Sequence, residues 1–207
     1  MKIAVFVSGG GTNLQAIIDR IKEGKLKDVK IVLVIASNES AFALQRAADN
    51  NIPSVVMSVK SFASREEWDD AVVEKLREAG AELIVLAGYL SLLGQKTVKA
   101  YNNRIINIHP ALIPAFCGKG MYGIKPHEAA LARGVKVSGA TVHLVNENYD
   151  EGPILLQKCV DVLPDDTPET LQKRIMKECE QDILPRAIGL FAQGKIEIKN
   201  NIAYVKE

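Results

Sequence analysis

The sequence predicts an α/β fold in which a mostly parallel sheet is flanked by helices. Over the first hundred residues, short apolar runs typical of buried strands alternate with segments whose apolar residues recur at helical spacing. This alternation implies right-handed βαβ crossovers and therefore parallel strands. In the second half, two longer apolar runs follow each other without a helix between them, which predicts an antiparallel C-terminal part.

The first half contains four predicted strands and three predicted helices. Leu14, Ile17 and Ile21 lie at helical spacing and form the expected buried stripe of the first helix. Ser64, with Glu67 three residues later, is a capping box that marks the start of the third helix. The predicted strands are Lys2–Val7, Lys30–Ala36, Ile52–Met57 and Glu82–Ala87, and the predicted helices are Asn13–Gly24, Ala41–Asn50 and Ser64–Ala79.

The second half is predicted to hold longer strands and one long helix. Thr167 as N-cap and Pro168 at the first helical position start this helix, which runs to about Gln193. Pro185 lies inside it and is expected to kink it. A short helical segment precedes the next strand. The strands are Arg104–His109, Val137–Val145 and Pro153–Val162, and a small closing hairpin is expected from Lys195–Ile198 and Ala203–Val205.

Composition and charge favour one globular domain over residues 1–207. Apolar residues make up 47% of the chain and charged residues 25%, which is ordinary for such a protein. We find no internal repeat, low-complexity segment or linker. The formal charge is +1, without a basic run, so neither nucleic acid nor an anionic membrane is the expected partner.

Cysteine usage favours a reducing compartment. Cys117, Cys159 and Cys179 form no close pair. Cys159 and Cys179 lie in apolar patterns and are expected in the core, whereas Cys117 lies in a predicted loop. The first apolar run ends at Ser8–Gly11, too early for a signal peptide or a spanning helix. We therefore expect a cytoplasmic protein. Its sequence does not distinguish a monomer from a homodimer.

A glycine-rich turn, Ser8–Asn13, joins the first strand to the first helix. Glycines let a backbone approach a ligand closely, and the N–H groups of a helix start suit a phosphate. Leu14 stands where a dinucleotide-binding turn has its third glycine, and Ala36–Asn38 supplies no acid at the end of the second strand. The turn is therefore predicted to bind a single phosphate, or else to be a tight turn without a ligand.

Two polar side chains share one face at the end of the strand that Pro110 terminates. Asn107 and His109 are two residues apart, so in a strand they point the same way. Asp150 lies on a predicted turn about forty residues later, where its carboxylate can orient the imidazole. Amide, imidazole and carboxylate together can stabilise an oxyanion and move a proton.

The two other histidines carry weaker signals. His127 is expected at a helix start, either lining the pocket or outside it, and His143 alternates along a strand and is expected to be structural. No two histidines have metal-ligand spacing, so we expect no metal site.

From Ile3 to about Val205 the chain resembles the phosphoribosylglycinamide formyltransferase family, the folate-dependent transformylases of purine synthesis. Three segments carry the resemblance: Ser8–Ala16, Asn107–Pro114 and Asp150–Ile154. It implies a Rossmann-like formyltransferase fold with a phosphate-binding half, residues 1–100, and a catalytic and folate-binding half, residues 101–207.

The resemblance also implies a reaction and its residues. The formyl group of 10-formyltetrahydrofolate, a co-substrate, would pass to the glycinamide amine of 5-phosphoribosylglycinamide. The implied catalytic residues are Asn107, His109 and Asp150. The implied substrate contacts are Gly11, Thr12, Asn13, Lys177 and Glu180, of which the last two are expected on one helix face. The implied folate contacts are Arg65, Leu90, Ser91, Leu92 and Leu93, with Asn107 and the Asn146–Asp150 loop over the pterin.

Two departures from the family pattern bear on these expectations. Ser91 stands where familiar members carry an arginine, so folate affinity depends on whether that contact is made by backbone or side chain. The Gly-rich loop Cys117–Ile124 is longer than in many relatives, and is either a lid or an insertion.

In the expected mechanism, Asp150 raises the pKa of His109 and keeps its imidazole protonated.

Other functions remain open at this point. A formyltetrahydrofolate hydrolase can use the same three catalytic residues with water as acceptor, although it normally carries a further domain before the catalytic part. A formyltransferase acting on initiator tRNA needs an additional C-terminal domain and a basic surface. A non-catalytic sugar-phosphate sensor needs only the glycine-rich turn, and has no reason to bring Asn107, His109 and Asp150 together.

Overall fold

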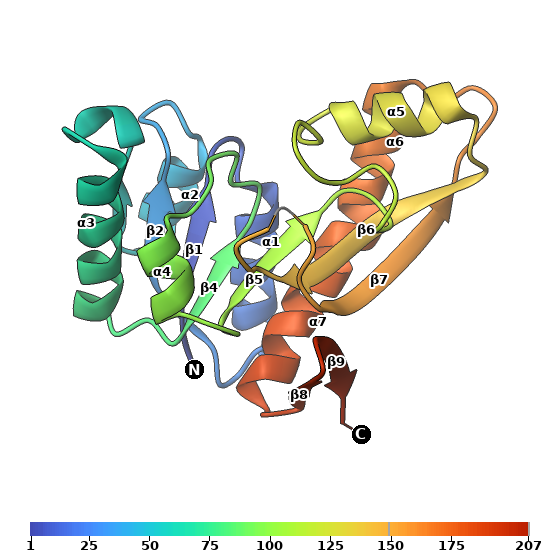
Figure 1. The fold of residues 1–207 in the computed structure, drawn as a ribbon. Coiled ribbons are helices and arrows are strands. Elements are labelled where there is room, and N and C mark those ends of the chain that lie inside the picture. The colour runs from blue at the N-terminus through green and yellow to red at the C-terminus, as the bar shows by residue number, and fades with distance from the viewer. Residues whose placement is uncertain (149, 207) are drawn as a thin grey trace. The chain divides into compact units, whose positions relative to one another are not determined.

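A seven-stranded sheet flanked by helices forms the framework of the protein (Figure 1). The structure is a computed structural model and describes residues 1–148 and 150–206. The strand order is β3-β2-β1-β4-β5-β6-β7, and β8 and β9 form a separate two-stranded sheet. Together with the antiparallel pairing of β6 and β7 this confirms the predicted fold class. The chain divides into two compact units, Met1–Ile106 and Asn107–Glu207.

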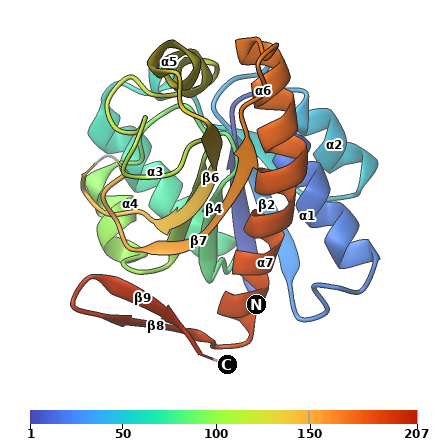
Figure 2. The ribbon, with the colours of Figure 1, turned by 90° about the vertical axis from the view of Figure 1, so that its right-hand side faces the viewer.

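The first unit is a parallel α/β layer structure. β1 pairs in parallel with β2 and with β4, and β2 pairs in parallel with β3. Figure 2 shows α1 and α2 on one face of these strands and α3 and α4 on the other. The strands are β1 (Lys2–Val7), β2 (Lys30–Ala36), β3 (Ser54–Val56) and β4 (Leu83–Leu86). The helices are α1 (Thr12–Lys22), α2 (Ala43–Asp49), η1 (Val59–Ser61), α3 (Arg65–Glu78) and α4 (Gln95–Ala100).

Caps fix the helices of the first unit. Ser64 accepts a hydrogen bond from the N–H of Glu67 at 3.0 Å, which confirms the predicted start of α3. One turn into α3, the buried carboxylate of Asp69 accepts the backbone N–H groups of Lys96 (2.8 Å) and Thr97 (3.1 Å) at the start of α4. Asp69 therefore caps a helix other than its own and ties α4 to α3.

The second unit places two antiparallel strands against a long helical segment. β6 pairs with β7 in antiparallel register, from Val137 opposite Asp161 to His143 opposite Ile154. The elements from the unit boundary onward are β5 (Ile105–His109), α5 (Lys125–Arg133), β6 (Val137–Leu144), β7 (Ile154–Asp161), α6 (Pro168–Ile175), η2 (Met176–Glu180), α7 (Gln181–Ala192), β8 (Ile196–Lys199) and β9 (Ile202–Val205). The predicted closing hairpin is confirmed by the antiparallel pairing of β8 with β9.

Two details of the second unit differ from the prediction. The long helix is interrupted by a π-helical turn, η2 (Met176–Glu180), one turn before Pro185. Such turns insert an extra residue into a helix, so the helical register changes upstream of the proline. Cys179 is buried as predicted, but Cys159 is exposed, because β7 is the last strand of the sheet and its outer positions are only partly covered.

No helix in the part of the chain that the structure describes is long and apolar enough to cross a membrane.

Candidate active site

His109, at the end of β5, is buried, and each of its ring nitrogens has a polar neighbour. Its Nε2 donates a hydrogen bond to the carbonyl oxygen of Phe116 at 2.9 Å. A carbonyl only accepts, so this bond places a proton on Nε2. The other nitrogen, Nδ1, lies 3.7 Å from Oδ2 of Asp150. In the neutral imidazole Nδ1 carries no proton, and a second proton would therefore enter between His109 and Asp150.

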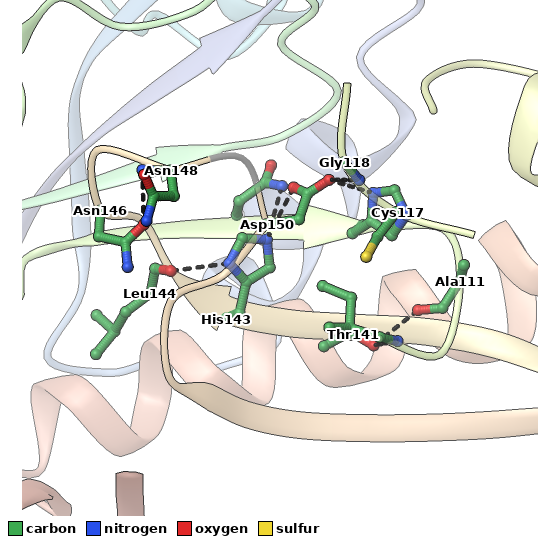
Figure 3. Close-up of polar contacts among 12 residues, drawn as sticks. Ala111, Cys117, Gly118, Thr141, His143, Leu144, Asn146, Asn148 and Asp150 are labelled. Carbon is green, nitrogen blue, oxygen red and sulfur yellow. Dashed lines mark hydrogen bonds and ion pairs between the residues drawn. The ribbon is translucent and has the colours of Figure 1, made fainter. Parts of the chain in front are cut away.

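Asp150 is held between a backbone amide and a second histidine (Figure 3). Its Oδ2 accepts the N–H of Gly118 at 2.8 Å, and its Oδ1 lies 3.4 Å from Nε2 of His143. Asp150 has a φ of 54°, a left-handed conformation that aspartate tolerates better than most residues. Gly152 lets the chain return against β6, because a Cβ there would lie 1.9 Å from the carbonyl oxygen of Leu144.

The pKa of His109 differs from the sequence-based expectation. Burial lowers the pKa of His109 below 6.5 and outweighs the Phe116 carbonyl and the charge of Asp150, which both raise it. Asp150 acts in the expected direction, but the imidazole is neutral at pH 7 in this structure. Burial raises the pKa of Asp150, yet the neighbouring His143, the Gly118 N–H and, once its imidazole has bound a proton, His109 together bring this pKa below its usual value.

His143, which the sequence pattern assigned a structural role, contacts two of the three predicted catalytic residues. Its Nδ1 donates to the carbonyl oxygen of Leu144 at 2.8 Å, so its Nε2 carries the lone pair. Nε2 accepts a hydrogen bond from the Asn107 amide at 3.1 Å. The signal that could have indicated this contact is the alternation of Thr141 and His143 along β6, which parallels that of Asn107 and His109 along β5.

Thr141 fixes the chain that follows His109. Its hydroxyl donates to the carbonyl oxygen of Ala111 at 2.7 Å and accepts the N–H of Ile113 at 3.1 Å (Figure 3). The side-chain amide of Gln157 donates to the same hydroxyl at 3.0 Å. β6 and β7 thus determine where the turn after β5 lies, and through it the position of His109.

His127 lies within the first turn of α5, as predicted, and is fully buried. Neither ring nitrogen has a hydrogen-bond partner among the residues described. Burial, together with the nearby His109, lowers the pKa of His127 to about 4. His127 is therefore neutral at physiological pH, and the structure does not join it to Asn107 or Asp150 by a hydrogen bond.

In the first unit, the glycine-rich turn combines a packed glycine with two open ones. Gly11 has a φ of 68° and precedes α1, and a Cβ there would lie 2.7 Å from the Cβ of Ala43. Gly9 and Gly10 have nothing within 4 Å of a built Cβ. Gly11 is thus required by packing against α2, whereas Gly9 and Gly10 face open space that a ligand can enter.

The predicted folate segment of the first unit lies next to this turn. The N–H of Leu90 donates to the Ser8 hydroxyl at 2.9 Å. The Arg65 guanidinium donates to the carbonyl oxygen of Leu92 at 2.9 Å. Leu90 and Leu92 are exposed, with 59% and 47% of their surfaces accessible, which is unusual for two neighbouring leucines.

Lys177 and Glu180, expected on one helix face, both lie in the π-helical turn, where Lys177 is exposed and Glu180 is buried. The wider π turn changes the angle between residues three apart.

The loop predicted over the pterin, Asn146–Asp150, includes Tyr149, which lies outside the described residues. No group of three or more histidine, cysteine, aspartate or glutamate residues with the geometry of a metal site occurs within residues 1–148 and 150–206.

Comparison with known proteins places the chain in a family. The sequence pattern of the formyl transferase family matches residues 1–188, and the chain belongs to this family. It is 40% identical over 204 residues to a phosphoribosylglycinamide formyltransferase of Haemophilus influenzae, covering 99% of this chain and 93% of that protein. It is 42% identical to a chloroplastic enzyme of the same name from Arabidopsis thaliana, covering 95% and 67%.

A solved structure shows the same fold. Glycinamide ribonucleotide transformylase 1 from Symbiobacterium toebii has a TM-score of 0.94 and 41% identity, covering all of this chain and 94% of that one. The family resemblance predicted from the sequence is therefore confirmed. Together, these comparisons support formyl transfer in purine biosynthesis as the activity of this chain.

Proposed function

We propose that this enzyme transfers the formyl group of 10-formyltetrahydrofolate to the glycinamide amine of 5-phosphoribosylglycinamide, forming the N-formyl product and tetrahydrofolate. The observation that carries the proposal is the group formed by Asn107, His109, His143 and Asp150 at the ends of β5 and β6. It provides an amide donor, an imidazole donor and a carboxylate, all within 4 Å of a polar neighbour in the same group.

Asn107 and His109 would stabilise the oxyanion that forms when the amine attacks the formyl carbon. An amide nitrogen carries two hydrogens, and His143 accepts one of them, which leaves the other for the substrate. His109 already has its Nε2 proton in place, and the formyl oxygen would replace the Phe116 carbonyl as its acceptor. Each such donor is worth roughly 3 kcal/mol in the transition state.

Asp150 and His109 would also move the proton that the amine loses. The pKa of His109 is held below its usual value by burial, so its Nδ1 is free to accept a proton at pH 7. The carboxylate of Asp150, 3.7 Å away, would stabilise the imidazolium formed in this way. The proton then passes to the folate nitrogen as the C–N bond to the formyl group breaks, which balances the reaction without a covalent enzyme intermediate.

The contacts with the two substrates follow the family resemblance. Gly11, Thr12 and Asn13 would receive the phosphate and ribose, and Lys177 and Glu180 would make further contacts with the same substrate. Arg65 and the exposed segment Leu90, Ser91, Leu92 and Leu93 would receive the folate, with Asn107 at the reacting end. A cytoplasmic location and a monomeric or homodimeric state complete the proposal.

The test is to follow tetrahydrofolate release from 10-formyltetrahydrofolate with and without 5-phosphoribosylglycinamide. Release that requires the amine substrate supports the proposal. Equal release without it would indicate a hydrolase, and no release would indicate a sugar-phosphate-binding module. The N-formyl product, detected by mass spectrometry, must appear in equal amount to tetrahydrofolate.

A further inference from the structure

Arg46, on α2, contacts the glycine-rich turn and is not among the residues to which the proposed reaction assigns a role. Its Nε donates to the carbonyl oxygen of Gly10 at 2.8 Å, and its Nη1 donates to the side-chain oxygen of Gln15 at 3.0 Å. Its guanidinium lies 5.1 Å from the centre of the Phe42 ring. Three contacts therefore hold this cation in one orientation beside the turn.

Two successive carbonyls of the turn are bound by α2. The N–H of Ala43 donates to the carbonyl oxygen of Gly9 at 3.1 Å, and Arg46 binds that of Gly10. In a planar trans peptide the C=O and N–H bonds point in opposite directions. The N–H groups of Gly10 and Gly11, which belong to these two peptides, therefore point away from α2.

Successive N–H groups that point to one side form an anion-binding concavity. The open space beside Gly10 allows an anion to approach them. No acidic residue lies in the first turn of α1, and Arg46 contributes a positive charge. Arg46 thus acts on the turn in two ways: it fixes the Gly10–Gly11 peptide, and it makes the local potential favourable for a phosphate.

We propose that Arg46 is a positioning residue for the substrate phosphate, because it orients the N–H of Gly11 toward the phosphate through its bond to the Gly10 carbonyl. This inference rests on the proposed function, in which the turn receives a sugar phosphate. It predicts that Arg46 governs affinity for the phosphorylated substrate and leaves the folate side and the chemical step largely unaffected.

The first experiment is an NMR titration of the ¹⁵N-labelled protein with inorganic phosphate. In the wild type, the amide signals of Gly10 and Gly11 shift and saturate. In Arg46→Met these shifts are lost at the same phosphate concentrations. Arg46→Lys keeps the charge but not the planar donor group, and the Gly11 shift is expected to be strongly reduced in this variant also.

The second experiment measures steady-state kinetics. Arg46→Met should raise KM for 5-phosphoribosylglycinamide about 10- to 100-fold, as expected for a lost hydrogen bond from a charged donor. kcat and the folate KM should change less than about twofold, within the range of a surface substitution. Arg20→Met on α1 is the matched control, because it removes the same charge from a side chain that pairs with Glu23.

The outcomes separate the inference from the proposed function. Unchanged Gly10 and Gly11 shifts in both Arg46 variants, or a KM increase no larger than in Arg20→Met, would overturn the role of Arg46. A fall in kcat together with a rise in both KM values would indicate general damage to the fold and would overturn it too. Absence of formyl transfer by the wild type would refute the proposed function, while the phosphate titration would still decide the role of Arg46.

Discussion

The protonation state of His109 depends on competing effects of burial and charge. Burial lowers its pKa more than Asp150 raises it, so the imidazole is neutral at pH 7 but has a carboxylate ready to stabilise its charged form. This combination suits a group that must take up a proton and release it within one turnover.

Replacing Asp150 by asparagine tests this balance. Because the Asp150 charge raises the pKa of His109, Asp150→Asn should lower that pKa further below 6.5, and turnover should fall about 100-fold or more. Substrate affinities should change less than turnover. NMR titration of the imidazole and kcat measurements check both. An unchanged His109 pKa would remove Asp150 from the proton transfer.

A double variant tests whether the two residues act together. His109→Ala combined with Asp150→Asn should be far less harmful than the product of the two single effects, because each single change already disables the pair. Multiplicative losses in kcat would contradict a shared role.

His143 allows a separate prediction about Asn107. Replacing His143 by leucine removes the acceptor of the Asn107 amide hydrogen bond, so the amide is no longer oriented. We expect kcat to fall roughly 10- to 100-fold, as small misplacements of catalytic groups do. Folate affinity, measured by fluorescence titration, should change little. A kcat equal to that of the wild type would show that Asn107 is oriented without His143.

At the scale of elements, the turn between β1 and α1 contains one glycine required by packing, Gly11, and one, Gly10, that the proposed function assigns to phosphate binding. Gly10→Val would place a side chain in open space and should raise KM for the sugar phosphate without changing the melting temperature by more than about 2 °C. Gly11→Val would meet Ala43 at 2.7 Å in a left-handed conformation and should destabilise the protein by roughly 2 kcal/mol or more.

Thermal unfolding and substrate kinetics of both variants separate the two effects. Equal melting temperatures would show that the contact with α2 does not constrain Gly11. Unchanged KM for Gly10→Val would show that the phosphate does not approach this side of the turn.

The elements also show where sequence patterns reach their limit. The strands of the first unit are continuous apolar runs, and such runs were sufficient to predict β1, β2 and β4. The π-helical turn at Met176–Glu180 could not be predicted. The spacing of apolar residues indicates that a segment is helical, but it does not show where a single extra residue is inserted. The same insertion changes the angle between Lys177 and Glu180, for which α-helical spacing was assumed.

The site shows the same division between local and long-range information. The position of Asn107 and His109 on one strand, β5, was predictable because strand alternation is a local rule. The contact of His143 with both Asn107 and Asp150 arises from the neighbouring positions of β5 and β6 and the return of the chain at Gly152, which no local pattern encodes. The direction of the His109 pKa shift was predicted wrongly, because burial of the imidazole lowers this pKa and the extent of burial is known only from the folded structure.

At the scale of the whole molecule, stability should depend on pH through His127. Its pKa is about 4 in the folded protein and near 6.5 in the unfolded chain, so only the unfolded chain gains this proton between these values. Acidification from pH 6.5 to 4 should therefore cost roughly 3 kcal/mol of unfolding free energy from this residue alone. His109, with its lowered pKa, adds to the loss in the same direction.

Urea denaturation of the wild type and His127→Phe at pH 7 and pH 4.5 measures this contribution. The variant should be at least as stable as the wild type at pH 7, because it removes two buried polar atoms without partners. It should lose less stability on acidification, by roughly 2 to 3 kcal/mol. Parallel losses in the two proteins would show that His127 does not titrate on unfolding.

The packing of Gly11 against Ala43 predicts how the sequence of this turn changes in evolution. Gly11 would persist even in a related protein that no longer binds the substrate, since any larger residue there strains the backbone. Packing does not require glycine at position 10, and the proposed role of Arg46 is to position the phosphate. Both residues would therefore be replaced by others once selection for phosphate binding ceased. Inheritance of all three positions would thus distinguish a working lineage from one that has kept only the architecture.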